Sequence, residues 1–150
     1  MKHIMSVFIF VGLASATSLS QAACSFDIEV GDYLKFSAAD MAVEKSCESI
    51  TVNLKHGGKL PANIMGHNWV LSADADVQAI ATKGMSSGLV SNYVPAGDAR
   101  VLAASKVIGG GESTSVTFST EGLTSGSAYT FFCSFPGHSY SMRGAFTVNP

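Results

Sequence analysis

The chain has 150 residues, and its 9 lysines and arginines stand against 11 aspartates and glutamates, giving a formal net charge of −2 at pH 7. These charges are spread along the chain without a basic run, which argues against nucleic acid or an anionic membrane surface as a partner. The length suits one domain of ordinary size.

The first 22 residues are predicted to be a signal peptide. A short polar start precedes a largely apolar stretch over residues 4–13, which is too short to span a bilayer as a stable helix. Small and polar residues follow, and Ser20-Gln21-Ala22 fits a signal-peptidase site. Cleavage there would leave residues 23–150 as one exported domain. Acylation of Cys24 is a less favoured alternative, because Gln21 stands where a bacterial lipobox has leucine or a similar residue.

Export implies an oxidising compartment, so the cysteines are candidates for disulfide bonds. The chain has three cysteines, which allow one intramolecular bridge and leave one thiol. A bridge between Cys24 and Cys47 would tie the start of the domain to a later strand and would leave Cys133 free. A free thiol in such a compartment is open to oxidation unless it is buried or held by a metal.

Short strands are predicted for most of the exported domain. Apolar and polar residues alternate over 26–30 and 50–54, which is typical of strands that bury one face. Further strand-like runs follow at residues 68–71, 100–108, 115–118, 128–133 and 144–148. Turn-forming residues separate these runs at 57–58, 109–111, 125–126 and 136–137.

One segment breaks the strand pattern. Residues 72–81 carry Val77, Ile80 and Ala81 at helical spacing, and Ser72 is the expected N-cap. The glycine at Gly84 predicts that this helix is short. The expected fold is therefore all-β, a Greek-key sandwich or barrel of about eight strands with one short helical excursion.

A cysteine, a histidine and a methionine lie close together near the C-terminus, in the spacing Cys133-x4-His138-x3-Met142. Thiolate and thioether are soft ligands, which disfavour calcium and magnesium, and structural zinc seldom binds methionine. Two histidines, one cysteine and a weak axial methionine describe a blue-copper electron-transfer site. The second histidine would be His56 or His67, and spacing alone does not choose between them.

Two motifs carry a family resemblance: Gly66-His67-Asn68-Trp69 and Cys133-Ser-Phe-Pro-Gly-His138-Ser-Tyr-Ser-Met142. Together with the pair Cys24 and Cys47, and with similarity over nearly all of residues 23–150, they resemble the azurins, a family of bacterial blue-copper cupredoxins. The resemblance implies a cupredoxin-like fold around one copper ion that cycles between Cu(I) and Cu(II).

The resemblance also implies the roles of individual residues. His67, Cys133 and His138 would bind copper in one plane, with Met142 as a weak axial ligand and the carbonyl oxygen of Gly66 opposite. A glycine suits that position because its backbone can approach closely. Hydrogen bonds from Asn68 and Phe135 would steady the ligand loop and the thiolate. The remaining implied roles are a disulfide between Cys24 and Cys47, a non-ligand His56, and core packing for Trp69.

The implied function is a periplasmic carrier of single electrons, and not an enzyme. Its expected partners are transient redox proteins, such as c-type cytochromes or a periplasmic reductase, and the expected state is a monomer. A copper chaperone or scavenger is an alternative, but the six methionines are scattered. A multicopper or nitrite-reducing enzyme would need more histidines. The implied docking patch, in which Ser141 departs from the usual leucine, comprises Leu34, Met65, Met85, Phe135, Gly137, Tyr140 and Ser141.

Overall fold

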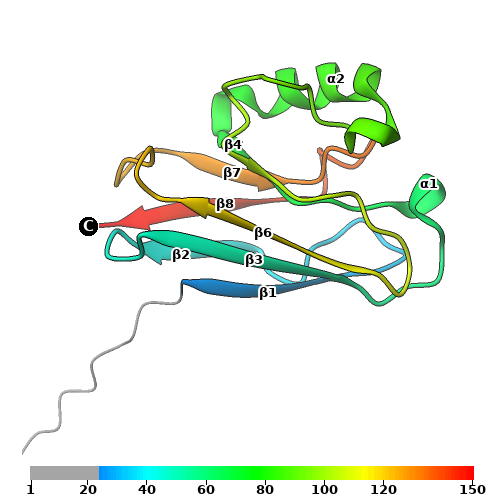
Figure 1. Ribbon diagram of the computed structural model, residues 1–150, viewed down its shortest axis with the longest axis horizontal. Helices are drawn as coiled ribbons and strands as arrows, with labels where there is room; N and C mark the ends of the chain where they lie inside the picture. Colours follow the sequence, from blue (N-terminus) through cyan, green and yellow to red (C-terminus); the bar gives the residue numbers. More distant parts are fainter. Residues whose placement is uncertain (1–23) are drawn as a thin grey trace, which may run out of the picture.

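Two facing β-sheets form the protein in a computed structural model, which describes residues 24–150 (Figure 1). The predicted signal peptide over residues 1–22 lies outside the described residues. The first sheet has the order β1-β3-β6, from strands Ser25–Val30, Ser49–His56 and Ser113–Ser119. The second has the order β2-β8-β7-β4-β5, from strands Asp40–Glu44, Arg143–Asn149, Tyr129–Phe132, Val70–Ala73 and Ala103–Ala104.

The strand pairing is mixed. β1 runs parallel to β3, and β2 runs parallel to β8, whereas the remaining pairs are antiparallel. The chain crosses between the sheets at each step from β1 to β4 and again from β5 to β7, as in a Greek-key sandwich, whereas β4–β5 and β7–β8 stay in one sheet. The predicted all-β fold of about eight strands is confirmed.

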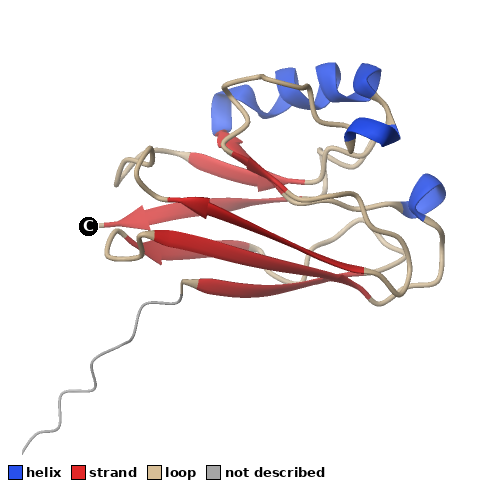
Figure 2. Ribbon diagram, in the orientation of Figure 1, coloured by secondary structure: helices blue, strands red, loops and turns tan. Residues whose placement is uncertain are grey.

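The helices lie outside the sandwich. Helix α2 (Val77–Ser87) runs along the side of the sandwich that carries β4 and β7, and the short α1 (Ala62–Met65) stands at the end opposite the C-terminus (Figure 2). Two single turns of 3-10 helix flank α2, namely η1 (Asp74–Asp76) and η2 (Leu89–Ser91).

The predicted start of the helix was wrong. Ser72 belongs to β4, and its hydroxyl donates to the carbonyl of Ala73, so it caps nothing. The helix begins only at Val77 and continues through Gly84 to eleven residues. A Cβ at Gly84 would come 2.0 Å from the carbonyl oxygen of Tyr93, so the glycine marks the close passage of a loop and not a helix end.

Two strand predictions also need correction. Of the run over residues 100–108 only Ala103–Ala104 pairs with β4, because the flanking backbone forms turns and single bridges. Strand β2 was missed, although Met41 and Val43 alternate with exposed neighbours and are buried. The alternation is short and follows the loop over residues 31–39, so the pattern alone did not indicate a strand.

Aromatic side chains fill the space between the sheets. The ring of Trp69 is fully buried and stacks on Phe118 and Phe131, with ring centroids 5.8 and 5.9 Å apart. Phe146 meets the same indole edge-on at 6.3 Å. These contacts bear out the expected core role of Trp69, which directly follows His67 and Asn68 in the chain.

A disulfide joins Cys24 to Cys47 across a sequence separation of 23 residues. Replacing both residues by alanine is expected to lower the free energy of unfolding by about 3 kcal/mol, because the bridge restricts the unfolded chain. Urea unfolding of the variant and of the parent protein under oxidising conditions measures the difference. A change of less than about 0.5 kcal/mol would contradict this account of the bridge.

Candidate metal centre

Three buried side chains converge at the end of the sandwich opposite the C-terminus. The sulfur of Cys133 lies 3.8 Å from Nδ1 of His67 and 3.6 Å from Nδ1 of His138. The three ligand atoms all lie within 4.8 Å of one another. Among residues 24–150, the structure thus brings together three of the residues that the sequence assigned to copper.

The backbone fixes the position of each side chain. His67 precedes β4 and exchanges two hydrogen bonds with Ile108, of 3.0 and 2.9 Å. Cys133 directly follows β7, and its amide donates to the carbonyl of Met142 at 2.9 Å. The amide of Met142 donates in turn to the carbonyl of His138 at 2.9 Å, so the loop from 133 to 142 closes on itself.

The hydrogen bonding of His67 directs its lone pair inward. Its Nε2 donates to the carbonyl oxygen of Gly31 at 2.8 Å, since a carbonyl can only accept. In the neutral ring Nδ1 is then the unprotonated nitrogen, and it faces the sulfur of Cys133. A hydrogen bond of this kind at the far ring nitrogen is the usual support of a metal-binding histidine.

Burial sets the protonation of the cluster. It raises the pKa of the Cys133 thiol to about 12, although backbone N–H groups of Asn68 and Phe135 that donate to the sulfur work in the opposite direction. Burial, with a smaller contribution from the charge of His67, lowers the pKa of His138 to about 4. Burial also lowers the pKa of His67. At pH 7 the copper-free cluster is therefore neutral, and a bound metal ion displaces one proton, from the thiol.

Two further residues assigned to copper lie beside this cluster. Met142 is fully buried in the same loop as Cys133 and His138. Gly66 directly precedes His67, and a Cβ there would come 2.2 Å from the carbonyl oxygen of Ala62 and 2.6 Å from Cγ1 of Val107. Its backbone is thus packed too closely for any side chain.

Asn68 ties the two ligand segments together. Its side-chain oxygen accepts from the amide of Ser134 at 2.9 Å. Its side-chain nitrogen donates to Oγ of Ser134 at 2.8 Å and to the carbonyl of Asn92 at 2.9 Å. The Phe135 ring packs on His138 at a centroid distance of 4.6 Å and on Tyr93 at 5.2 Å. The supporting roles of Gly31, Ser134 and Asn92 were missed, because backbone carbonyls and a lone serine give no sequence signal.

His56 does not join the cluster. Its ring stacks on His67 at a centroid distance of 5.1 Å. Its Nδ1 accepts from the amide of Gly58, and its Nε2 donates to the carbonyl of Met65, both at 3.0 Å. Both ring nitrogens are therefore engaged with backbone and point to no shared ligand.

The predicted docking patch lies at the same end of the molecule, and its members differ in exposure. Tyr140 is 75% exposed, Met85 48% and Leu34 41%. Phe135 is only 9% exposed, so its ring lies mostly beneath the surface of the patch. A groove between α2 and the ligand loop, of about 250 Å³, is lined by residues that include Met85, Phe135 and Tyr140.

The copper-free protein is expected to lose stability as the pH falls from 7 to 5. The pKa of His138 falls from 6.5 to about 4 on folding, so its contribution is present above pH 6.5 and is lost on acidification toward pH 4. At pH 5 the loss from this group amounts to about 2 kcal/mol. Urea unfolding at the two pH values measures it, and a His138→Gln variant should show a smaller difference. Equal stabilities of the parent protein at pH 7 and pH 5 would contradict the prediction.

The donor set fits copper better than the common alternatives. One thiol and two imidazoles with inward lone pairs are soft to intermediate ligands, and a thioether lies in the same loop. Calcium and magnesium would require oxygen ligands, which the cluster does not offer. A buried site of this kind at one end of a Greek-key sandwich defines a protein of the cupredoxin class.

Comparison with known proteins agrees with that class. Residues 22–149 match the family described as copper binding proteins, plastocyanin/azurin family. An azurin of Pseudomonas denitrificans is 54% identical over 127 residues, which cover 85% of this chain and 99% of that protein. An azurin of Bordetella pertussis is 51% identical over 143 residues, 95% of each chain. A solved azurin, Az-iso2 of Methylomonas sp. strain J, superposes with a TM-score of 0.83 at 43% identity, covering 86% of this chain and all of that one.

The chain therefore belongs to the plastocyanin/azurin family of copper binding proteins. It is a blue copper protein that transfers electrons, and it is not an enzyme. Within residues 24–150, no helix is both long enough and apolar enough to cross a membrane.

Proposed function

We propose that this protein carries single electrons between periplasmic redox partners, with one copper ion held by His67, Cys133 and His138. The thioether of Met142 would hold the ion more weakly, and the carbonyl oxygen of Gly66 would be a further weak ligand. The supporting observation is the buried thiol flanked by two imidazole Nδ1 atoms at 3.8 and 3.6 Å. When bound, copper supplies a one-electron couple between Cu(I) and Cu(II).

The chain's own contribution is a rigid, dry site. The hydrogen bond from His67 to Gly31 and those of Asn68 hold both ligand segments against each other. The aromatic cluster around Trp69 supports them from the core. Ligands that stay in place in both oxidation states keep the rearrangement on electron transfer small. Burial of the cluster also excludes water as a competing ligand.

A copper chaperone or scavenger remains the second candidate function. Such a protein hands over its metal and needs ligands that a partner can reach. Here His67 and Cys133 are fully buried, and His138 is almost so. This burial favours a resident ion over an exchangeable one.

The decisive experiment for the site is optical. Loading the purified protein with Cu(II) is expected to give a strong blue colour that bleaches with ascorbate and returns on reoxidation. A colourless or pale copper adduct would refute the proposed copper–thiolate site. Rapid loss of copper to a competing chelator, with the colour present, would favour the chaperone.

We also propose export through a signal peptide over residues 1–22, which leaves the domain 23–150 in the periplasm. Its partners are then transient redox proteins such as c-type cytochromes or a periplasmic reductase, and its state is a monomer. Mass spectrometry of a periplasmic extract should find a chain that begins at Ala23. A full-length or acylated chain would contradict this, and light scattering tests the monomer.

Met142→Gln is expected to lower the reduction potential of the copper-loaded protein. A neutral thioether favours the reduced state, whereas an amide oxygen is a harder donor and favours the oxidised state. Cyclic voltammetry measures the shift. Met85→Gln is the matched control, because Met85 lies exposed on α2 and should leave the potential nearly unchanged. An unchanged or higher potential for Met142→Gln would refute the axial role of Met142.

A further inference from the structure

We propose that the end of the molecule that carries the copper ligands is electropositive, and that it docks redox proteins whose own docking face is acidic. This inference rests on the proposed electron-carrier function. It goes beyond that function because the net charge of the chain, −2, predicts the opposite preference. The proposal is based on how charged and exposed apolar side chains are distributed between the two ends of the sandwich.

The exposed apolar side chains gather at the ligand end. Loops and short helices at this end supply most of the large hydrophobic side chains that the described residues expose to solvent. We call this set the apolar face: Tyr33, Leu34, Leu60, Ile64, Met85, Val90 and Tyr140. Helix α1, which carries Ile64, stands at this end in Figure 1. An apolar face of this kind is typical of a protein contact surface.

Four exposed cations come from loops at this end and from the start of β8, and we call them the basic rim: Lys35, Lys59, Lys106 and Arg143. Arg143 directly follows Met142, and Lys35 directly follows Leu34. Lys106 lies two residues before Ile108, which bridges His67. None of the four forms an ion pair in the described part of the chain, where the ion pairs involve Lys83 and Arg100.

Two carboxylates in the loops at this end, Asp32 and Glu112, are engaged with backbone. Asp32 accepts from the amides of Lys59 and Leu60 at 2.8 and 3.1 Å, which lowers its pKa. Glu112 accepts from the amide of Gly109 at 2.7 Å.

Exposed Lys55 and Glu29 are paired neighbours on β3 and β1 near this end, so their charges offset each other. Asp40 is a further exposed carboxylate, at the start of β2 beside the start of β8. With Asp40 counted, the four cations of the basic rim face three anions, which leaves the ligand end with a small excess of positive charge.

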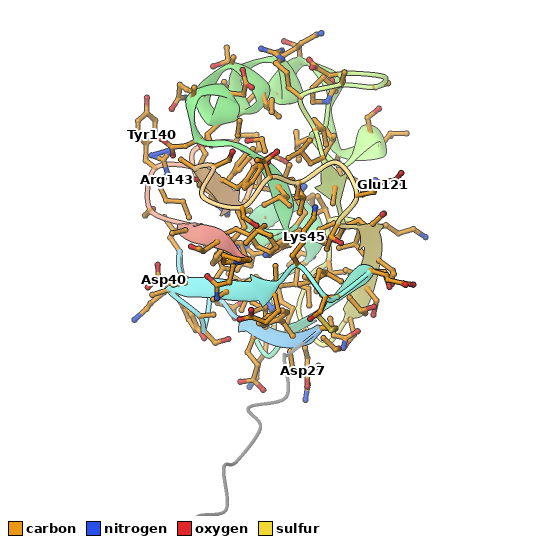
Figure 3. All side chains as sticks on the ribbon, turned by 90° about the vertical axis from the view of Figure 1, so that its left-hand side faces the viewer. Asp27, Asp40, Lys45, Glu121, Tyr140 and Arg143 are labelled. Atoms are coloured by element: carbon orange, nitrogen blue, oxygen red, sulfur yellow. A yellow bond between two sulfur atoms is a disulfide. The ribbon has the colours of Figure 1, made fainter. Side chains whose placement is uncertain are left out.

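The opposite end is acidic. Strand ends and turns there carry five carboxylates, Glu44, Glu48, Asp74, Asp76 and Glu121. Two cations lie among them, Lys45 and Arg100, and the guanidinium of Arg100 is 4.0 Å from Asp76. The amide of Thr120 donates to the carbonyl of Glu48, and the amide of Asp74 donates to the carbonyl of Ala128, so the loop over residues 120–128 joins the other two segments. Figure 3 views the molecule from this end, with Lys45 near the centre of the view, Glu121 at its right-hand edge, and Tyr140, Arg143 and Asp40 at its left-hand edge.

The separation of charge matters because salt screens distant charges. The Debye length at physiological ionic strength is about 8 Å, so a partner at the ligand end responds to the basic rim more than to acidic groups across the sandwich. Complementary charge at a docking face mainly raises the association rate. A basic rim around an apolar face is complementary to a redox protein that carries acidic side chains around its own redox centre.

Small redox ions test the sign of the field directly. The reduced, copper-loaded protein gives one electron to hexacyanoferrate(III), a trianion, which becomes hexacyanoferrate(II). Between about 10 and about 200 mM ionic strength, this rate is expected to fall at least about threefold. The rate with tris(phenanthroline)cobalt(III), a trication, should rise. The reverse pair of salt dependences would overturn the proposal.

Charge variants locate the field. Lys59→Gln with Lys106→Gln should remove most of the salt dependence with hexacyanoferrate(III). Lys45→Gln with Lys83→Gln changes the net charge equally but at other positions, so it should keep that dependence. Equal effects of the two pairs would show that only net charge matters, and that would overturn the proposal.

A readout without electron transfer separates this inference from the proposed function. Paramagnetic hexacyanochromate(III), added to the Cu(I) protein, is expected to broaden the backbone NMR signals around the basic rim and not those around Glu48 and Glu121. Broadening at the acidic end instead would overturn the inference even for an active carrier. If neither redox ion accepts an electron, the carrier function fails while the NMR result still decides the charge question.

The choice of a protein partner is tested separately. At low salt the reduced protein should react faster with an acidic c-type cytochrome than with a basic one. Co-sedimentation with phosphatidylglycerol vesicles would instead show that the basic rim binds an anionic membrane surface, and it would contradict the proposal of a protein partner.

Discussion

Cys133→Ser is expected to abolish the blue colour of the copper-loaded protein. The colour requires a copper–thiolate bond, and Cys133 is the one cysteine outside the Cys24–Cys47 disulfide in the described chain. A hydroxyl in the same buried position is a harder and weaker donor, so copper affinity should fall at least about a hundredfold, beyond the usual effect of altering a supporting residue. Absorption spectra and competition with a chelator measure both effects.

The disulfide supplies a matched cysteine control. A protein with Cys24→Ala and Cys47→Ala loses two sulfur atoms and about 3 kcal/mol of stability, yet it should keep the colour, because neither sulfur lies in the ligand cluster. A blue Cys133→Ser protein, or a colourless double variant that is still folded, would contradict the assignment of the thiolate.

The sequence predicted the sandwich because its strands are amphipathic. Alternation over β1 and β3 is regular, and the structure buries the apolar set of each strand, such as Ile50, Val52 and Leu54. The prediction failed where tertiary contacts override local pattern. Residues 100–108 have strand-like composition, but most of their backbone pairs in turns and bridges.

The helix shows the same limit. Its predicted start at Ser72 followed from capping propensity, but β4 pairs Ser72 with Thr130 of β7 and so keeps it in the sheet. The helix is short, as predicted, but it runs through Gly84 to Ser87, and that glycine accommodates the carbonyl of Tyr93. The start and the course of the helix thus depend on contacts with residues outside it.

The ligands in the loop could be predicted from the sequence, because three candidates lie within ten residues. Spacing did not identify His67 as the second histidine, since His56 has a similar local setting and only the motif resemblance separated the two. The structure supplies the physical difference. Nδ1 of His67 faces the thiol, whereas both nitrogens of His56 are engaged with backbone groups. Supports such as Gly31 act through carbonyls, which sequence patterns do not reveal.

Asn68→Ala is expected to destabilise the protein by about 3 kcal/mol or more. The substitution leaves the buried amide of Ser134 without its partner, and a loss of this kind costs about 1–3 kcal/mol. It also removes the donor to Oγ of Ser134 and the shorter of the two hydrogen bonds to the carbonyl of Asn92. Because Asn68 joins the segment of His67 to the loop of Cys133, copper should also dissociate faster. Urea unfolding of the copper-free protein and the rate of copper loss to a chelator measure the two effects.

Asn53→Ala is the matched control for this prediction. Asn53 also hydrogen-bonds through its side chain, to Asp27 and Ser115, but on the outer face of the first sheet. Water can replace those partners, so its loss should cost less than about 1 kcal/mol and leave copper release unchanged. Equal losses of stability for the two variants would show that the hydrogen bonds of Asn68 contribute no more than those of an exposed side chain. A large loss of stability without faster copper release would show that it supports the fold but does not hold the two ligand segments together.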